Sequence, residues 1–166
     1  MILAVDVSYH ETRAAAAGVL LTAWEDGEPS RVLRAELDHV AAYVPGQFYK
    51  RELPCILSLT NQLERLPEVI LVDGYVYLGS ERRPGLGQHL YDVLGRRSSV
   101  VGVAKTRFKD TPAVEVFRGR SRNPLYITAV GIDETKARDC IARMHGPHRI
   151  PAMLKLVDKL SRQLPS

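Results

Sequence analysis

Apolar residues form nearly continuous runs at the start of the chain, and this pattern predicts strands over residues 1–9 and 12–24, separated by a short polar turn. Residues 31–37 alternate between apolar and polar side chains and predict a third strand, so the first three strands are expected to form an antiparallel meander. Between residues 49 and 66 the apolar side chains recur at helical spacing, which predicts a helix that carries Pro54 in its first turn.

Shorter apolar runs and amphipathic segments alternate along the rest of the chain, without a repeat or a linker. The expected strands are 68–72, 99–104, 114–117 and 125–130, the last two paired through a turn at 118–124. The expected helices are 88–94, 133–144, which has Asp133 as its N-cap, and 151–163. This order predicts one α/β domain over residues 1–166, in which helices flank a mixed sheet that begins with the meander and continues with parallel strands.

The sequence predicts neither a membrane span nor a secretory signal. The longest apolar run, 14–24, is far shorter than the roughly 20 residues that a span needs, and Asp6 interrupts the apolar start of the chain. Cys55 and Cys140 stand alone, without the spacing of a disulfide framework or a zinc site. We therefore expect a cytoplasmic protein with no membrane partner, and we expect it to be a monomer.

Charge is distributed unevenly along the chain, although the net charge is only +4. Residues 1–80 carry a net charge of −5, and residues 81–166 carry +9. The basic residues are densest over 96–122, where they either form a solvated face or lie along the phosphate backbone of a nucleic acid. The candidates for such phosphate contacts are Arg107, Lys109, Arg118, Arg120 and Arg122.

Three carboxylates occupy positions in otherwise apolar segments. Asp6 lies within the first strand, Asp73 follows the strand predicted at 68–72, and Glu52 lies near the start of a helix. An unpaired buried carboxylate is costly, so such a residue usually has a partner. Together the three carboxylates would form an oxygen-rich site, suited to Mg²⁺ or Mn²⁺ rather than to zinc. Each residue also has a purely structural explanation, since Asp73 precedes Gly74 in a typical turn pair and Glu52 suits the positive end of a helix dipole.

Four ordered blocks of the sequence resemble the endonuclease V family of inosine-directed nucleases, which has a ribonuclease H-like fold. The blocks are AVDVSY at 4–9, YVPG at 43–46 with KRE at 50–52, VDG at 72–74 with RRPGL at 82–86, and GVAK at 102–105. The similarity continues more weakly through 124–128 and 150–158, and it therefore covers most of the chain.

The resemblance implies roles for individual residues. Asp6, Glu52 and Asp73 would hold Mg²⁺, for which Mn²⁺ can substitute, and Lys105 would be the active-site lysine. Asp158 falls where the family has an acidic residue or a histidine, and it is either a fourth ligand or a solvated residue on a helix surface. The implied substrate contacts are a wedge containing Tyr43 and Pro45, and a pocket for the flipped base lined by Gly46, Gly74, Gly85 and Leu86.

The implied activity is metal-dependent hydrolysis of a phosphodiester on the 3′ side of inosine or deoxyinosine, in DNA repair or RNA processing, which leaves 3′-hydroxyl and 5′-phosphate ends. Two alternatives stay open: a catalytically weakened nucleic-acid-binding module of the same fold, and a junction-cutting nuclease with the same carboxylates. The sequence departs from the family at Ala42, where proline is common, and over 75–80, so base readout is expected to differ. The chain is also shorter than familiar members.

Overall fold

The N-terminal strands form the predicted antiparallel meander. A computed structural model describes residues 1–38, 42, 44, 45, 47 and 49–163. Strand β2 (Arg13–Leu21) pairs antiparallel with β1 (Ile2–His10) on one side and with β3 (Arg31–Leu37) on the other. The second strand ends earlier than predicted because the backbone N–H groups of Thr22 and Ala23 both turn to the Asp26 carboxylate, each at 3.0 Å.

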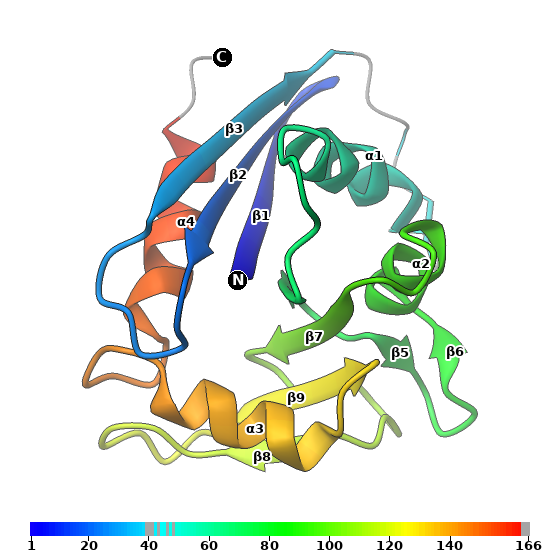
Figure 1. Ribbon diagram of the computed structural model, residues 1–166. Coiled ribbons are helices and arrows are strands. Elements are labelled where there is room, and N and C mark those ends of the chain that lie inside the picture. The colour runs from blue at the N-terminus through cyan, green and yellow to red at the C-terminus, as the bar shows by residue number, and fades with distance from the viewer. Residues whose placement is uncertain (39–41, 43, 46, 48, 164–166) are drawn as a thin grey trace.

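Two parallel strands join the meander beside β1. Strand β4 (Val69–Asp73) pairs parallel with β1, and β7 (Ser99–Ala104) pairs parallel with β4. Antiparallel strands β9 (Leu125–Val130) and β8 (Val114–Val116) complete a seven-stranded sheet of order β3-β2-β1-β4-β7-β9-β8 (Figure 1). The predicted mixed sheet is confirmed, including the pairing of its last two strands.

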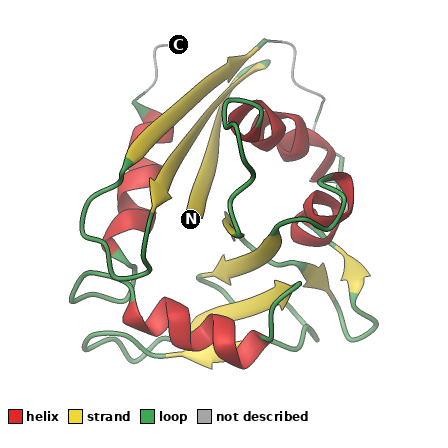
Figure 2. Cartoon of the chain, in the orientation of Figure 1, coloured by secondary structure: helices red, strands yellow, loops and turns green. Residues whose placement is uncertain are grey.

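Helices cover both faces of this sheet (Figure 2). Helices α1 (Tyr49–Thr60) and α2 (Leu86–Val93) share one hydrophobic core with Leu3 and Val5 of β1. Helices α3 (Glu134–Arg143) and α4 (Ala152–Arg162) share the other core with Ile2 and Ala4. Because side chains alternate along a strand, the even-numbered side chains of β1 point towards α4. Asp133 caps α3 as predicted, since its carboxylate accepts hydrogen bonds from two backbone N–H groups at 2.9 and 3.1 Å.

Helix α1 is shorter than predicted, and Pro54 occupies its second turn. The helix ends at Thr60, where two tightened turns follow, and Leu63 and Leu66 pack against the α1–α2 core from an irregular segment. Pro67 prevents the helix from continuing beyond Leu66, because a residue before proline disfavours the helical conformation. Pro54 itself is exposed, so water can hydrogen-bond to the carbonyl that its missing N–H leaves without a helical partner.

A short hairpin between β4 and α2 was not predicted. Strands β5 (Tyr77–Leu78) and β6 (Arg83–Pro84) form a separate two-stranded sheet. The N–H of Gly85 then donates to the carbonyl of Val76 at 2.9 Å and turns the chain into α2, which begins two residues earlier than predicted. Within the described residues, none of the helices has the length and hydrophobicity needed to cross a bilayer.

Candidate metal centre and nucleic-acid interface

The register of the parallel strands brings Asp6, Asp73 and Lys105 together on one face at one edge of the sheet. Ala4 of β1 lies opposite Leu71 of β4, so Asp6 and Asp73, each two residues further on, are at the same level. Lys105 lies two residues beyond the partner of Asp73 in β7. Since side chains alternate along each strand, all of these residues belong to the face that α3 and α4 cover.

These side chains line a cavity of about 40 Å³ together with Asp158 of α4. The walls are otherwise apolar and come from Val5, Leu71, Val72, Val103, Leu125, Ile150, Leu154 and Val157. Asp158 also forms an ion pair with Arg162, one helical turn further on, at 3.1 Å. Asp158 is therefore a half-exposed helix residue that borders the same cavity as Asp6 and Asp73.

Burial and mutual repulsion shift the titration of these carboxyl groups. Burial raises the pKa of Asp6 to about 6; a hydrogen bond from Ser161 opposes this shift, and the charges of Asp73 and Asp158 add to it. Burial also raises the pKa of Asp73, which Lys105 opposes and Asp158 reinforces. The carboxylates thus interact across the cavity.

Glu52 approaches this edge of the sheet from α1, which covers the other face. Burial raises the pKa of Glu52 to about 8, the charges of Asp6 and Asp73 add to the shift, and Arg51 opposes it. Glu52 does not line the small cavity, but it lies close enough to the two aspartates for their charges to act on it.

The donor chemistry fits a hard divalent cation. Within the described part of the chain, no three His, Cys, Asp or Glu side chains already surround one point closely enough to hold a metal ion. The available donors are nevertheless carboxylate oxygens, which Mg²⁺ and Mn²⁺ prefer. Their pKa values are raised by desolvation and by neighbouring negative charge, and a bound cation would compensate for both.

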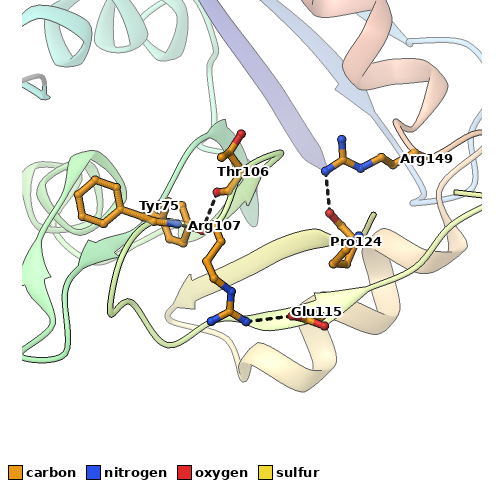
Figure 3. Close-up of polar contacts among 7 residues, drawn as sticks. Tyr75, Thr106, Arg107, Glu115, Pro124 and Arg149 are labelled. Carbon is orange, nitrogen blue, oxygen red and sulfur yellow. Dashed lines mark hydrogen bonds and ion pairs between the residues drawn. The ribbon is translucent and has the colours of Figure 1, made fainter. Parts of the chain in front are cut away.

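The segment that follows Lys105 is held by Tyr75, the second residue after Asp73. The Tyr75 hydroxyl donates a hydrogen bond to the carbonyl of Thr106 at 2.8 Å and accepts one from the N–H of Phe108 at 2.9 Å (Figure 3). The rings of Tyr75 and Phe108 lie 6.1 Å apart between centroids. This tyrosine, in the segment that departs from the family pattern, therefore joins the end of β4 to the segment after β7.

Arg149, just before α4, holds the same segment from the other side. Its guanidinium donates to the backbone carbonyl of Pro124 at 2.7 Å (Figure 3). It also donates to the backbone carbonyl of Lys105. The Lys105 backbone is thus tied to the chain before α4, while its side chain is exposed. Sequence reasoning missed Arg149 and Ser161, because each acts on a residue far away along the chain and neither belongs to a recognisable motif.

The residues predicted to contact the base are only partly described. Tyr43 and Gly46 lie outside the described residues, and Pro45 is exposed. Gly74 has φ +114°, a conformation that favours glycine, and a Cβ at Gly85 would lie 3.0 Å from a backbone carbonyl. Both glycines border the chain around Tyr75. Leu86, in contrast, is 7% exposed and packs in the α1–α2 core, which leaves little of its side chain for a base.

The basic segment after Lys105 contains exposed arginines and one buried arginine. Arg107 is exposed, pairs with Glu115 at 3.0 Å (Figure 3) and lies over the Tyr126 ring. Three further basic residues of this segment are exposed as well: Lys109, Arg120 and Arg122. They are therefore accessible to a phosphate backbone.

Arg118 requires a correction, because it is 6% exposed and does not face solvent. Its guanidinium donates to the carbonyls of Met144, Gly146, His148 and Arg149, at distances of 2.6 to 3.3 Å. Burial lowers its pKa. The prediction that Arg118 contacts phosphate was wrong, since this residue holds the loop between α3 and α4.

Comparison with known proteins identifies the family. The sequence matches the family model for endonuclease V over residues 1–159. The chain belongs to the endonuclease V family. Endonuclease V of Pyrococcus horikoshii is 32% identical over 165 residues, which cover 97% of this chain and 72% of that protein. The chain spans only 40% of the length of another curated endonuclease V that it matches, from Dehalococcoides mccartyi.

Solved endonuclease V structures share the fold. The human structure superposes with a TM-score of 0.76 at 26% identity, over 98% of this chain and 82% of that chain. The structure of Ciona intestinalis endonuclease V, in complex with a 23mer DNA that contains an inosine followed by a ribo-adenosine, has a TM-score of 0.78 at 19% identity and covers 98% of this chain and 83% of that one. The expected ribonuclease H-like fold is thereby confirmed.

Proposed function

We propose that this chain is a metal-dependent endonuclease that hydrolyses a phosphodiester on the 3′ side of inosine in DNA or RNA. The observation that carries the proposal is the convergence of Asp6, Asp73 and Lys105 on one cavity, in a member of the endonuclease V family. The inosine-containing DNA bound by the Ciona protein supports the choice of substrate. Such an enzyme would act in DNA repair or RNA processing, and we expect it to work as a cytoplasmic monomer.

The carboxylates would hold the metal ion. Asp6, Glu52 and Asp73 are the proposed ligands, and Asp158 borders the same cavity as a fourth candidate. When bound, Mg²⁺ or Mn²⁺ supplies Lewis acidity, which activates water and stabilises negative charge on the phosphate. Hydrolysis then joins the water oxygen to phosphorus and breaks the bond to the 3′ oxygen, which takes up a proton, so the products are a 3′-hydroxyl and a 5′-phosphate.

Lys105 supplies positive charge beside the reacting phosphate. Its side chain is exposed, lines the cavity and lies close enough to Asp73 to oppose the shift in that pKa. A positioned ammonium group stabilises negative charge that develops in the transition state. The hydrogen bonds that Tyr75 and Arg149 make to the surrounding backbone restrict the movement of this lysine.

The remaining residues would contact two parts of the substrate, its phosphate backbone and the flipped base. We propose that Arg107, Lys109, Arg120 and Arg122 lie along the phosphate backbone. The turn through Gly74 and Gly85 would approach the flipped base, and the segment that contains Tyr43, Pro45 and Gly46 would act as the wedge. Leu86 and Arg118 have no place in this proposal, because both are buried.

A cleavage assay on paired substrates tests the proposal. Oligonucleotides with one deoxyinosine or one riboinosine, and matched strands with adenosine instead, are incubated with the protein and Mg²⁺ or Mn²⁺. We expect a single cut 3′ to the inosine, dependent on the metal, and no cutting by Asp73→Asn. Equal cutting of the inosine-free strands would overturn the specificity, and binding without cutting by the wild-type protein would instead support the binding-module alternative.

A further inference from the structure

We propose that Ser161 is a positioning residue for the Asp6 carboxylate and thereby sets the affinity of the site for a divalent cation. The inference rests on the proposed function, because it concerns the same cation. Ser161 lies 155 residues from Asp6 along the chain, on the helix that also carries Asp158.

The Ser161 hydroxyl is buried and directed at Asp6. The residue is 1% exposed, and its Oγ donates a hydrogen bond to Oδ2 of Asp6 at 2.6 Å. The same Oγ lies 2.9 Å from the backbone carbonyl oxygen of Asp158, three residues earlier. A hydroxyl has a single proton, and the shorter hydrogen bond to a charged oxygen is the stronger one. The proton of Ser161 therefore serves mainly the Asp6 carboxylate.

A second hydrogen bond joins strand β1, which carries Asp6, to helix α4, which carries Ser161, and its donor is on the strand. The hydroxyl of Ser8, two residues after Asp6 on β1, donates to the backbone carbonyl of Ser161 at 2.7 Å. Strand β1 and helix α4 are thus joined by one hydrogen bond from the helix to the strand and one from the strand to the helix. This pair of contacts fixes the position of Ser161 relative to Asp6.

The contact has a consequence for cation binding. Without it, repulsion from Asp73 and Asp158 favours rotation of the Asp6 carboxylate away from the cavity. With one lone pair of Oδ2 engaged by Ser161, Oδ1 is the Asp6 oxygen that this contact leaves entirely free for a cation. Hydrogen-bond partners of metal-ligating groups typically change metal affinity by about 10- to 100-fold when they are removed.

Direct measurement of Mn²⁺ binding by titration calorimetry, on the full chain without nucleic acid, tests the inference. The variants are Ser161→Ala, Ser161→Cys and the matched control Ser98→Ala. Ser98 is also 1% exposed and donates one hydrogen bond of 2.7 Å, to the carbonyl of Pro67, but it lies just before β7, at the other end of that strand from Lys105. If Ser161 had a purely structural role, its replacement would act as Ser98→Ala does: it would lower the unfolding temperature and leave the Mn²⁺ affinity unchanged.

We expect Ser161→Ala to weaken Mn²⁺ binding about 10-fold or more, while Ser98→Ala binds as the wild type does. Ser161→Cys keeps the shape of the side chain, slightly enlarged, but a thiol is a poor donor, so this variant should weaken binding as well, even if the alanine variant does not fold. If every Ser161 variant that folds binds Mn²⁺ with wild-type affinity, this inference is overturned, while the proposed function stands. Absence of Mn²⁺ binding by the wild-type protein would overturn the proposed metal site together with it.

Discussion

Replacing Arg118 by alanine should destabilise the fold, whereas replacing Arg120 should weaken binding to nucleic acid. Arg118 is buried against the loop between α3 and α4, and Arg120, two residues further on, is exposed. The Arg118 guanidinium donates four hydrogen bonds to backbone carbonyls, two of them at 2.6 Å. Since its removal leaves these carbonyls without their partner, the two substitutions should affect different measurements.

The size of the Arg118 effect follows from the hydrogen bonds. At about 1 kcal/mol net for each bond, Arg118→Ala should lower the free energy of unfolding by about 3–4 kcal/mol. For a domain of this length, each kcal/mol lowers the unfolding temperature by about 2–4 °C, so the expected drop is about 6–16 °C. Arg120→Ala should change the unfolding temperature by no more than about 2 °C.

Thermal unfolding and binding at several salt concentrations separate the two roles. Binding is measured by fluorescence anisotropy on an inosine-containing strand, with each arginine variant made in the Asp73→Asn background so that the strand stays uncut. Arg120→Ala should reduce the slope of log affinity against log salt by about one, the value for one lost phosphate contact. If Arg118→Ala unfolds at the wild-type temperature but reduces this slope, the structural role of Arg118 is wrong.

Three further predictions follow from the contacts and pKa shifts. Tyr75→Phe removes the hydroxyl that holds residues 106–108, so amide hydrogen exchange there should become about 10-fold faster while exchange in α3 stays unchanged; equal protection in both proteins would contradict this role. The metal-free protein should become less stable to heat as the pH rises from about 5 to about 8. The pKa of Glu52 in the folded state, about 8, lies above its ordinary value of 4.5, so the folded state binds more protons than the unfolded state in this range. Glu52→Gln should flatten the upper part of this profile, and a parallel profile would show that Glu52 does not titrate there. Asp133→Ala should lower the free energy of unfolding by about 1 kcal/mol through loss of the α3 N-cap, whereas Asp133→Asn keeps an acceptor; equal unfolding temperatures of the two variants would exclude the cap effect.

The elements that carry the candidate ligands could be predicted from sequence because their signals are local. Strands β1, β4 and β7 are buried between helices on both faces, so they read as continuous apolar runs, and Asp6 and Asp73 are conspicuous within them. Polar residues at the ends of neighbouring parallel strands necessarily come close together. The strand bounds of β7 and β9 and the cap at Asp133 were correct for the same reason, since each depends on nearby residues.

Long-range contacts could not be predicted in this way. The basic residues near Arg118 in the sequence are exposed, and nothing in that segment shows that the α3–α4 loop will surround Arg118 itself with carbonyl groups. The contact between Ser161 and Asp6 depends on how α4 is rotated against β1, which one sequence does not reveal. The β5–β6 hairpin is so short that no periodic pattern can develop.

The packing of α4 explains how a fold of ordinary composition can hold several carboxylates together. Asp6 and Asp73 project from the sheet towards a helix that brings a third carboxylate, Asp158, to the same cavity. Of the described residues that line this cavity, Lys105 is the only cation, and Ser161 donates its hydrogen bond to one carboxylate oxygen of Asp6. Burial raises the pKa values of Asp6 and Asp73, and the remaining repulsion adds to both shifts, so folding leaves these carboxylates incompletely compensated. Binding of either protons or a cation stabilises a site with such incompletely compensated carboxylates. At neutral pH, where protons are scarce, the same charges that weaken the fold therefore favour a divalent ion.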